Sequence, residues 1–143
     1  MKLSECRRFD QTFTHIDDDG DGMVTVFNTS AMVESAIRGK IEPEEVEIDP
    51  ALAEFVMRSH AVSAAKADAL PEKALLNPIL LIQFADGKYL LADGNHRFVK
   101  ASRVGRKTIL AWLLPESVWR DFVVEDIPRN LLEVMIADVR SGA

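Results

Sequence analysis

The sequence predicts an α/β (α+β) fold in which helices pack on a small mixed sheet. Its 143 residues are 48% apolar, which is enough for one hydrophobic core but short for two folded domains. Patterns typical of a strand, a helix and a strand follow one another over 88–92, 95–104 and 108–114, an order that characterises α/β cores. We therefore expect residues 1–143 to form a single domain.

Residues 1–40 predict a β-hairpin followed by a short helix. The segments 13–16 and 23–27 are β-rich and flank a polar acidic tract, a pattern typical of two strands joined by a loop. Ser30 can cap a helix over 31–38, and Gly39 stands where that helix should end.

The middle of the chain predicts a longer helix. Asp49-Pro50 is a start signal, because Asp accepts hydrogen bonds from free amides and Pro tolerates the first helical position. The helix is expected to run over about 50–69, with a break near Ser59 and His60.

The second half alternates strands and helices. Asp86-Gly87 forms a tight turn between strands over 79–84 and 88–92. A helix over 95–104 ends at Gly105, and the apolar run 108–114 follows as a buried strand. The tail predicts a short helix near 116–121 and a longer one over 129–140.

The composition limits the location and partners of the chain. Apolar runs are too short for a membrane-spanning helix of roughly 20 residues. The first residues lack the apolar stretch of a secretory signal, and Cys6 cannot form a disulfide within the chain. We therefore expect a cytoplasmic protein without a membrane partner.

The charge balance bears on nucleic acids. The chain carries 17 Lys and Arg against 23 Asp and Glu, and DNA binding usually requires a basic surface. Five basic residues on or just after the helix over 95–104 form a local face that could contact DNA, and solvated side chains explain them equally well. They are Arg97, Lys100, Arg103, Arg106 and Lys107.

The loop Asp93-Gly94-Asn95-His96-Arg97 is the main candidate site, because it joins a strand to a helix. A helix N-terminus offers unpaired amides and a partial positive charge, and a glycine lets the backbone approach an anion. Arg97 can grip phosphate oxygens, and His96 can transfer a proton. Asp93 could hold a Mg²⁺ that bridges to phosphate, or cap the helix.

A structural explanation of the loop stands beside this one. Asp-Gly is a common turn, Asp caps helices, and Arg and His in a first turn are often solvated or paired with carboxylates. The loop is nevertheless denser in polar residues than capping requires, which keeps a ligand role open beside the structural one.

The segment 77–109 resembles the core of the ParB/sulfiredoxin-like superfamily. The resemblance rests on the strand pair, the Asp-Gly-Asn-His-Arg loop, the helix, Gly105 and the next strand, and it extends over about 41–125. It implies a small α/β core at 41–125, with 1–40 as an N-terminal hairpin and helix appendage and 126–143 as a C-terminal helix. It also implies that the loop and the next helical turn bind nucleotide phosphates.

Members of this superfamily include CTP-binding partition proteins, ATP-using sulfiredoxins, free serine kinases and nuclease-like proteins. Sulfiredoxins carry a reactive Cys where this chain has Asn95, and Cys6 is distant in sequence. Partition proteins carry a helix-turn-helix domain after the core, for which 126–143 leaves little room. The loop is closest to the Asp-Gly-His-His-Arg form of the serine kinases.

A phosphotransfer reaction also needs a metal and often a carboxylate base. The resemblance places the family's first core strand and its following loop over 42–49, and Glu47 or Asp49 is the expected base. As part of an acidic run, however, such residues more often form a solvated edge. Ser59 and His60 are further candidates for lining the pocket, with a purely structural His as the alternative.

The acidic tract at 17–28 imitates half of a calcium-binding EF-hand loop. Asp17, Asp19 and Asp21 occupy its first, third and fifth positions, and Gly22 its sixth. The twelfth position, however, has Asn28 in place of the bidentate Glu. A charged hairpin turn explains the tract better than a weak Ca²⁺ or Mg²⁺ site.

These observations lead to one main hypothesis and two alternatives. The main one is a nucleotide-phosphate-binding domain, as a small-molecule phosphotransferase or NTP hydrolase that uses ATP or CTP with Mg²⁺. Gly94, Asn95 and the following amides would cradle phosphate. The alternatives are a DNA-binding or nuclease-like accessory protein of a plasmid or phage, and a nonenzymatic protein-interaction module.

Overall fold

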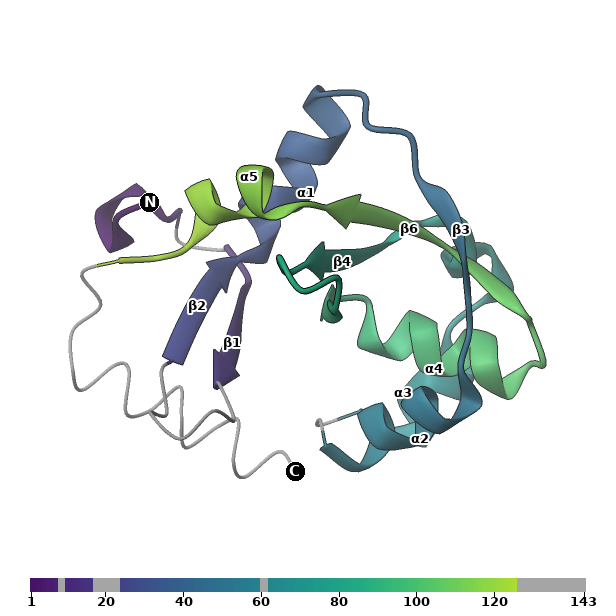
Figure 1. The fold of residues 1–143 in the computed structure, drawn as a ribbon. Helices are drawn as coiled ribbons and strands as arrows, with labels where there is room; N and C mark the ends of the chain where they lie inside the picture. The colour runs from purple at the N-terminus through teal and green to yellow at the C-terminus, as the bar shows by residue number, and fades with distance from the viewer. Residues whose placement is uncertain (8–9, 17–23, 60–61, 126–143) are drawn as a thin grey trace.

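Two β-sheets organise the part of the chain that the computed structural model describes, residues 1–7, 10–16, 24–59 and 62–125 (Figure 1). The strands are β1 (Thr12–Ile16), β2 (Val24–Asn28), β3 (Glu44–Glu47), β4 (Ile79–Gln83), β5 (Tyr89–Asp93) and β6 (Thr108–Leu114). The α-helices are α1 (Thr29–Arg38), α2 (Pro50–Ser59), α3 (Ala64–Ala69), α4 (Asn95–Arg103) and α5 (Glu116–Trp119). Short 3₁₀ helices are η1 (Leu3–Glu5), η2 (Glu72–Leu76) and η3 (Arg120–Phe122).

The larger sheet is mixed, as the sequence predicts. Its strand order is β3-β6-β4-β5, and β4 and β6 are parallel while the other two pairs are antiparallel. β4 and β6 are central, and Ile79 pairs with Ala111 between them. β3 and β5 form the opposite edges of this sheet.

Helices α2, α3 and α4 cover one face of the larger sheet. Ala53 and Val56 of α2 and Phe98 and Val99 of α4 are buried against strand residues such as Ile79. These apolar positions stand on one side of each helix, and their removal from water supplies the main driving force for packing.

The N-terminal hairpin, α1 and α5 cover the other face. Phe27 of β2 is fully buried, and its ring meets the ring of Trp119 edge to face at a centroid distance of 5.4 Å. The indole Nε1 of Trp119 donates to the backbone oxygen of Gln83 at 2.8 Å, which joins α5 to β4. Residues 1–40, expected as an appendage, therefore contribute to one of the two clusters of the hydrophobic core.

The expected hairpins, the strand over 108–114 and the helix after the loop are all present. The helix expected over 50–69 is divided into α2 and α3, as the predicted break near Ser59 indicates. η2 was not expected. Three features of interest lie outside the described residues: the tract at 17–23, His60, and the helix expected over 129–140.

The cap of α1 differs from the prediction. The helix begins at Thr29, and the side-chain oxygen of Asn28 accepts from the amide of Ala31 at 3.0 Å. Ser30 instead accepts from the amide of Gln11 at 2.8 Å, which holds the start of β1 against the helix. Ser and Asn both cap helices, so residue type alone does not choose between Ser30 and Asn28. The end of β2 at Asn28 decides the position of the cap.

Across the described ranges, no helix has the length and apolar character that crossing a membrane requires.

The burial of Phe27 predicts a large loss of stability in Phe27→Ala. Truncation removes an aromatic ring from a closed core, and the free energy of unfolding should fall by about 3–5 kcal/mol in urea titrations. Phe55→Ala is the matched control, because 56% of Phe55 is exposed, and it should change stability by less than about 1 kcal/mol. Equal losses in the two variants would contradict the assignment of Phe27 to the core.

The ion pair between α3 and α4 predicts a pH-dependent contribution to stability. Arg103 donates to both carboxylate oxygens of Asp68, at 2.7 and 2.8 Å, and these hydrogen bonds lower the pKa of Asp68 from its ordinary 3.8. A lowered folded-state pKa stabilises the fold above the ordinary value, and this contribution disappears as the pH falls through the lowered value.

We therefore expect the difference in unfolding free energy between wild type and Asp68→Ala to stay constant above about pH 5 and to shrink below about pH 4. Urea titrations across this pH range measure it. A difference that grows in acid would show that the sign of this linkage is wrong.

Candidate functional site

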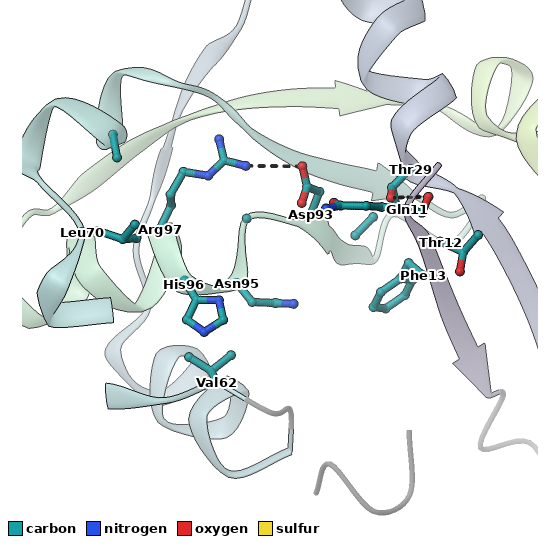
Figure 2. Close-up of a pocket in the computed structure, with 13 residues that line it drawn as sticks. Gln11, Thr12, Phe13, Thr29, Val62, Leu70, Asp93, Asn95, His96 and Arg97 are labelled. Carbon is teal, nitrogen blue, oxygen red and sulfur yellow. Dashed lines mark hydrogen bonds and ion pairs between the residues drawn. The ribbon is translucent and has the colours of Figure 1, made fainter. Parts of the chain in front are cut away.

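The predicted loop opens into a cavity of about 630 Å³ between the N-terminal hairpin and α4 (Figure 2). One wall is the loop itself, 93–97. The rest of the lining comes from segments far apart in sequence: Gln11, Thr12, Phe13, Thr29, Val62, Leu70, Ala74 and Ala92. Its volume lies within the range of small-molecule sites in proteins, about 300–1,000 Å³.

Gly94 makes the abrupt turn from β5 into α4. Its φ of 97° and ψ of 27° are left-handed, a conformation that residues with a Cβ rarely adopt. A Cβ at this position would lie 2.6 Å from Cγ2 of Ile79. The helix therefore begins directly on the sheet because position 94 lacks a side chain.

The first turn of α4 presents free backbone amides. The amide of Phe98 donates to the oxygen of Gly94 at 2.9 Å, which makes it the first amide with an intrahelical acceptor. The preceding amides at 95–97 have no acceptor within the helix, and Gly94 has no side chain to cap them. The partial positive charge of this helix end favours an anion.

Asn95 and His96 place two buried polar atoms without partners beside these amides. Within the described part of the chain, Oδ1 of Asn95 and Nε2 of His96 are inaccessible to solvent and make no hydrogen bond. Asn95 extends on the side of Phe13, and the imidazole of His96 lies on the side of Val62 (Figure 2). Leaving such an atom unpaired costs about 1–3 kcal/mol, so both side chains would gain a hydrogen bond by turning toward a polar ligand in the cavity.

The guanidinium of Arg97 does not point to the place where the sequence analysis expects a phosphate. Its Nη1 donates to the backbone oxygens of Asn77 and Pro78, at 3.0 and 2.9 Å, and its Nη2 donates to Oδ2 of Asp93 at 3.3 Å. The guanidinium points away from Asn95 and His96 (Figure 2). Arg97 thus fastens the start of β4 to α4 and contributes charge behind the loop.

Asp93 ends β5 at the border of the cavity, where its side chain is 34% exposed. It also borders a neighbouring cavity of about 430 Å³ beside α1. Among the residues described, no cluster of three or more His, Cys, Asp or Glu could by itself hold a metal ion. Metal binding by Asp93 with a nucleotide stays a prediction.

The two expected bases lie away from the loop. Glu47 ends β3, on the sheet edge opposite β5, and three strand spacings correspond to about 14 Å. Glu47 lines a separate cavity. Asp49 is exposed, and its Oδ1 accepts from the amide of Ala51 at 2.9 Å, as a cap of α2 does. The structure therefore does not bring Glu47 or Asp49 to the loop.

The other sequence candidates add little to this cavity. Ser59 is the last residue of α2, and its role at the cavity stays a prediction. His60 and the potential calcium ligands Asp17, Asp19 and Asp21 fall outside the described residues, so their roles stay predictions.

The basic residues of α4 are largely engaged within the protein. Lys100 donates to the backbone oxygen of Asp68 at 3.1 Å, and Arg103 pairs with the carboxylate of the same residue. Together with the bonds of Arg97, these contacts reduce the charge that this helix can offer to DNA.

The sequence analysis does not identify the hairpin residues that form one wall of the cavity. Phe13 begins a predicted strand, and Gln11 and Thr12 precede it. Nothing in their local pattern marks them as site residues. Only the packing of the hairpin on the larger sheet brings them to the loop.

Comparisons with protein-family models, curated proteins and solved structures find no match to this chain. The resemblance to the ParB/sulfiredoxin-like superfamily therefore rests on the loop motif and its flanking elements.

The close approach of Gly94 to Ile79 predicts two separate costs in Gly94→Ala. Alanine would be strained in the left-handed conformation, and its Cβ would also clash with Ile79, so the loss of stability should exceed the strain alone. The matched control is Gly87→Ala, because Gly87 has a similar φ of 83° and nothing lies within 4 Å of the point that its Cβ would occupy. Gly87→Ala should lose about 1–3 kcal/mol from strain, and Gly94→Ala more than that in the same urea titrations. Equal losses would show that the close approach to Ile79 carries no energetic weight.

Proposed function

We propose that this chain is a nucleotide-phosphate-binding domain whose phosphate site is the N-terminus of α4. The observation that carries the proposal is the pair of unpartnered buried atoms, Asn95 Oδ1 and His96 Nε2, beside the free amides of the same helical turn. All of them belong to the lining of one cavity of about 630 Å³.

The donors at the loop match the chemistry of a phosphate. Phosphate oxygens accept hydrogen bonds, and the amides at 95–97 offer donors in a favourable dipole field. His96 adds a donor at Nε2 when that nitrogen carries a proton. The charge of Arg97 lies behind the loop and strengthens the field without needing direct contact.

Asn95 can serve the phosphate or the group next to it. Rotation of its amide by half a turn exchanges Oδ1 and Nδ2, so the side chain can donate to a phosphate oxygen or accept from a sugar hydroxyl. A nucleotide presents both kinds of group, whereas an inorganic anion without hydroxyls presents acceptors alone.

The remaining walls suit the larger part of a nucleotide. Phe13, Val62, Leu70, Ala74 and Ala92 give the cavity apolar surface, against which a base and sugar ring can pack. We infer a ligand such as ATP or CTP, with its phosphates at the loop and its base toward the hairpin.

The same geometry supports a phosphotransferase or NTP hydrolase. Asp93 is the residue that would hold Mg²⁺ together with the nucleotide, and the metal would neutralise phosphate charge. Glu47 and Asp49 lie elsewhere, so His96 takes the proposed role of proton acceptor, through the ring nitrogen that does not donate to the phosphate.

The test is a thermal-shift screen of ATP, CTP, GTP and ADP, with and without Mg²⁺, on wild type and Asn95→Ala. A nucleotide at about 100 times its Kd should stabilise wild type by about 2.7 kcal/mol. Asn95→Ala should weaken the affinity at least tenfold, while the unliganded variant is as stable as wild type or more so, because it loses an unpaired buried oxygen.

Ser102→Ala is the matched control, since it also removes a polar group from α4 and Ser102 lines a different cavity. Arg97→Ala is unsuitable, because it removes three structural hydrogen bonds. Absence of stabilisation by every nucleotide would contradict the proposal and favour a nonenzymatic interaction module. Salt-sensitive retention on DNA without a nucleotide response would favour the DNA-binding alternative.

A further inference from the structure

The cavity of about 430 Å³ beside α1 adjoins the loop cavity. The two cavities share three lining residues, Gln11, Thr29 and Asp93. These residues lie close together in Figure 2, where Oγ1 of Thr29 donates to the backbone oxygen of Gln11 at 2.9 Å. A ligand beside α1 would therefore border a ligand at the loop.

Asp93 presents its carboxylate to the junction of the two cavities. It pairs with Leu80 in the register of β4 and β5, and Leu80 belongs to the core cluster on the hairpin side of the larger sheet. Paired residues of neighbouring strands point to the same face, so the side chain of Asp93 points toward the hairpin and α1. A carboxylate has about four lone pairs. One accepts from Arg97, which leaves others for a metal and for a hydroxyl.

The opposite wall of this cavity is one face of α1. The lining residues of the helix recur at intervals of three and four positions, which places their side chains on one side. They are Ser30, Val33, Glu34, Ile37 and Arg38. Val33 and Ile37 form an apolar strip, and 60% of Ile37 is exposed. Ser30, Glu34 and Arg38, each four residues apart, add hydrogen-bonding groups beside this strip.

The charges around this wall balance. The carboxylate of Glu34 pairs with Arg38 at 2.5 Å and also with Arg7. Arg7 in turn pairs with Asp10 at 3.6 Å. Hydrogen bonds from Asn28 and from the amide of Arg7 lower the pKa of Asp10, so it is ionised at neutral pH. Two cations thus meet two anions, which favours a ligand without net charge over an ion.

We propose that this cavity binds a neutral monosaccharide, which is the phosphoryl acceptor of the neighbouring nucleotide. The inference rests on the proposed nucleotide-binding function. Sugar hydroxyls both donate and accept hydrogen bonds. The lining offers acceptors at Asp93, donors at Arg38, and both kinds of group at Gln11. The C–H groups of a sugar ring can pack on the apolar strip of α1.

The reaction transfers one phosphoryl group. A sugar hydroxyl held at Asp93 forms a bond from its oxygen to the terminal phosphorus of the nucleoside triphosphate. The bond from this phosphorus to the bridging oxygen breaks, and the departing nucleoside diphosphate keeps the electron pair. The hydroxyl proton passes to His96, the proposed proton acceptor, and then to solvent. The products are a sugar phosphate and a nucleoside diphosphate.

The first test is calorimetric titration of the full chain, without nucleotide, with D-glucose, D-galactose and D-mannose. At least one of these hexoses should bind saturably. Its 2-amino and uronate forms carry the same ring with one positive or one negative charge. Each should bind at least threefold more weakly, because the balanced wall does not repay the desolvation of a charge.

A matched pair of variants locates the sugar. Arg38→Ala should weaken hexose binding about fivefold or more, because it removes a charged hydrogen-bond donor. Arg58→Ala is the control and should leave binding unchanged. Arg58 pairs with Glu54 four residues earlier, as Arg38 does with Glu34, and it lines a different cavity. The two arginine side chains are 78% and 76% exposed, so both variants are expected to fold.

The second test follows the transfer by phosphorus NMR with ATP and Mg²⁺. The hexose that binds should yield a sugar phosphate. Arg38→Ala should raise the KM for this hexose more than it lowers kcat, because Arg38 binds the sugar away from the reacting atoms.

Four results would overturn the proposal. They are no binding of any of the three hexoses, charged forms that bind as tightly as the neutral hexose, binding that Arg38→Ala leaves unchanged, and a bound hexose that yields no sugar phosphate although ATP stabilises the protein. A nucleotide response without hexose binding refutes this inference alone. Hexose binding without any nucleotide response refutes the nucleotide site and, with it, the acceptor role.

Discussion

Arg97 joins the first turn of α4 to the start of β4 through the carbonyls of Asn77 and Pro78. Gly94 brings the same turn so close to Ile79 that no Cβ fits between them. The orientation of the helix, and with it the direction of its free amides, depends on these contacts at the end of a central strand. A loop held on the sheet in this way is preorganised, which lowers the entropic cost of binding a ligand.

Ile79 also connects the loop cavity with the apolar cavity beneath α2. Its side chain contacts the position of Gly94, and it forms part of the floor of the apolar cavity beneath α2. The two cavities nevertheless differ in chemistry. The loop cavity has unpaired polar atoms at a helix N-terminus, whereas the lining of the other cavity is mostly apolar.

The N-terminal hairpin is as necessary to the loop cavity as the loop itself. Phe27 and Trp119 fix the hairpin on the second face of the larger sheet, and this placement puts Phe13 opposite the start of α4 (Figure 2). Core packing and site formation are therefore coupled, because the residues that bury the sheet also close the cavity.

Local patterns in the sequence determined the mixed α/β class, both hairpins, the break after α2 and the strand-to-helix loop, since turn chemistry and periodicity act over a few residues. They also placed Gly94, whose conformation only glycine adopts easily. The structure alone decided that Arg97 serves the fold, that Glu47 lies at the opposite sheet edge, and that the hairpin walls the cavity. These outcomes depend on strand order and on which faces are buried together, and such long-range contacts leave no mark in any single segment.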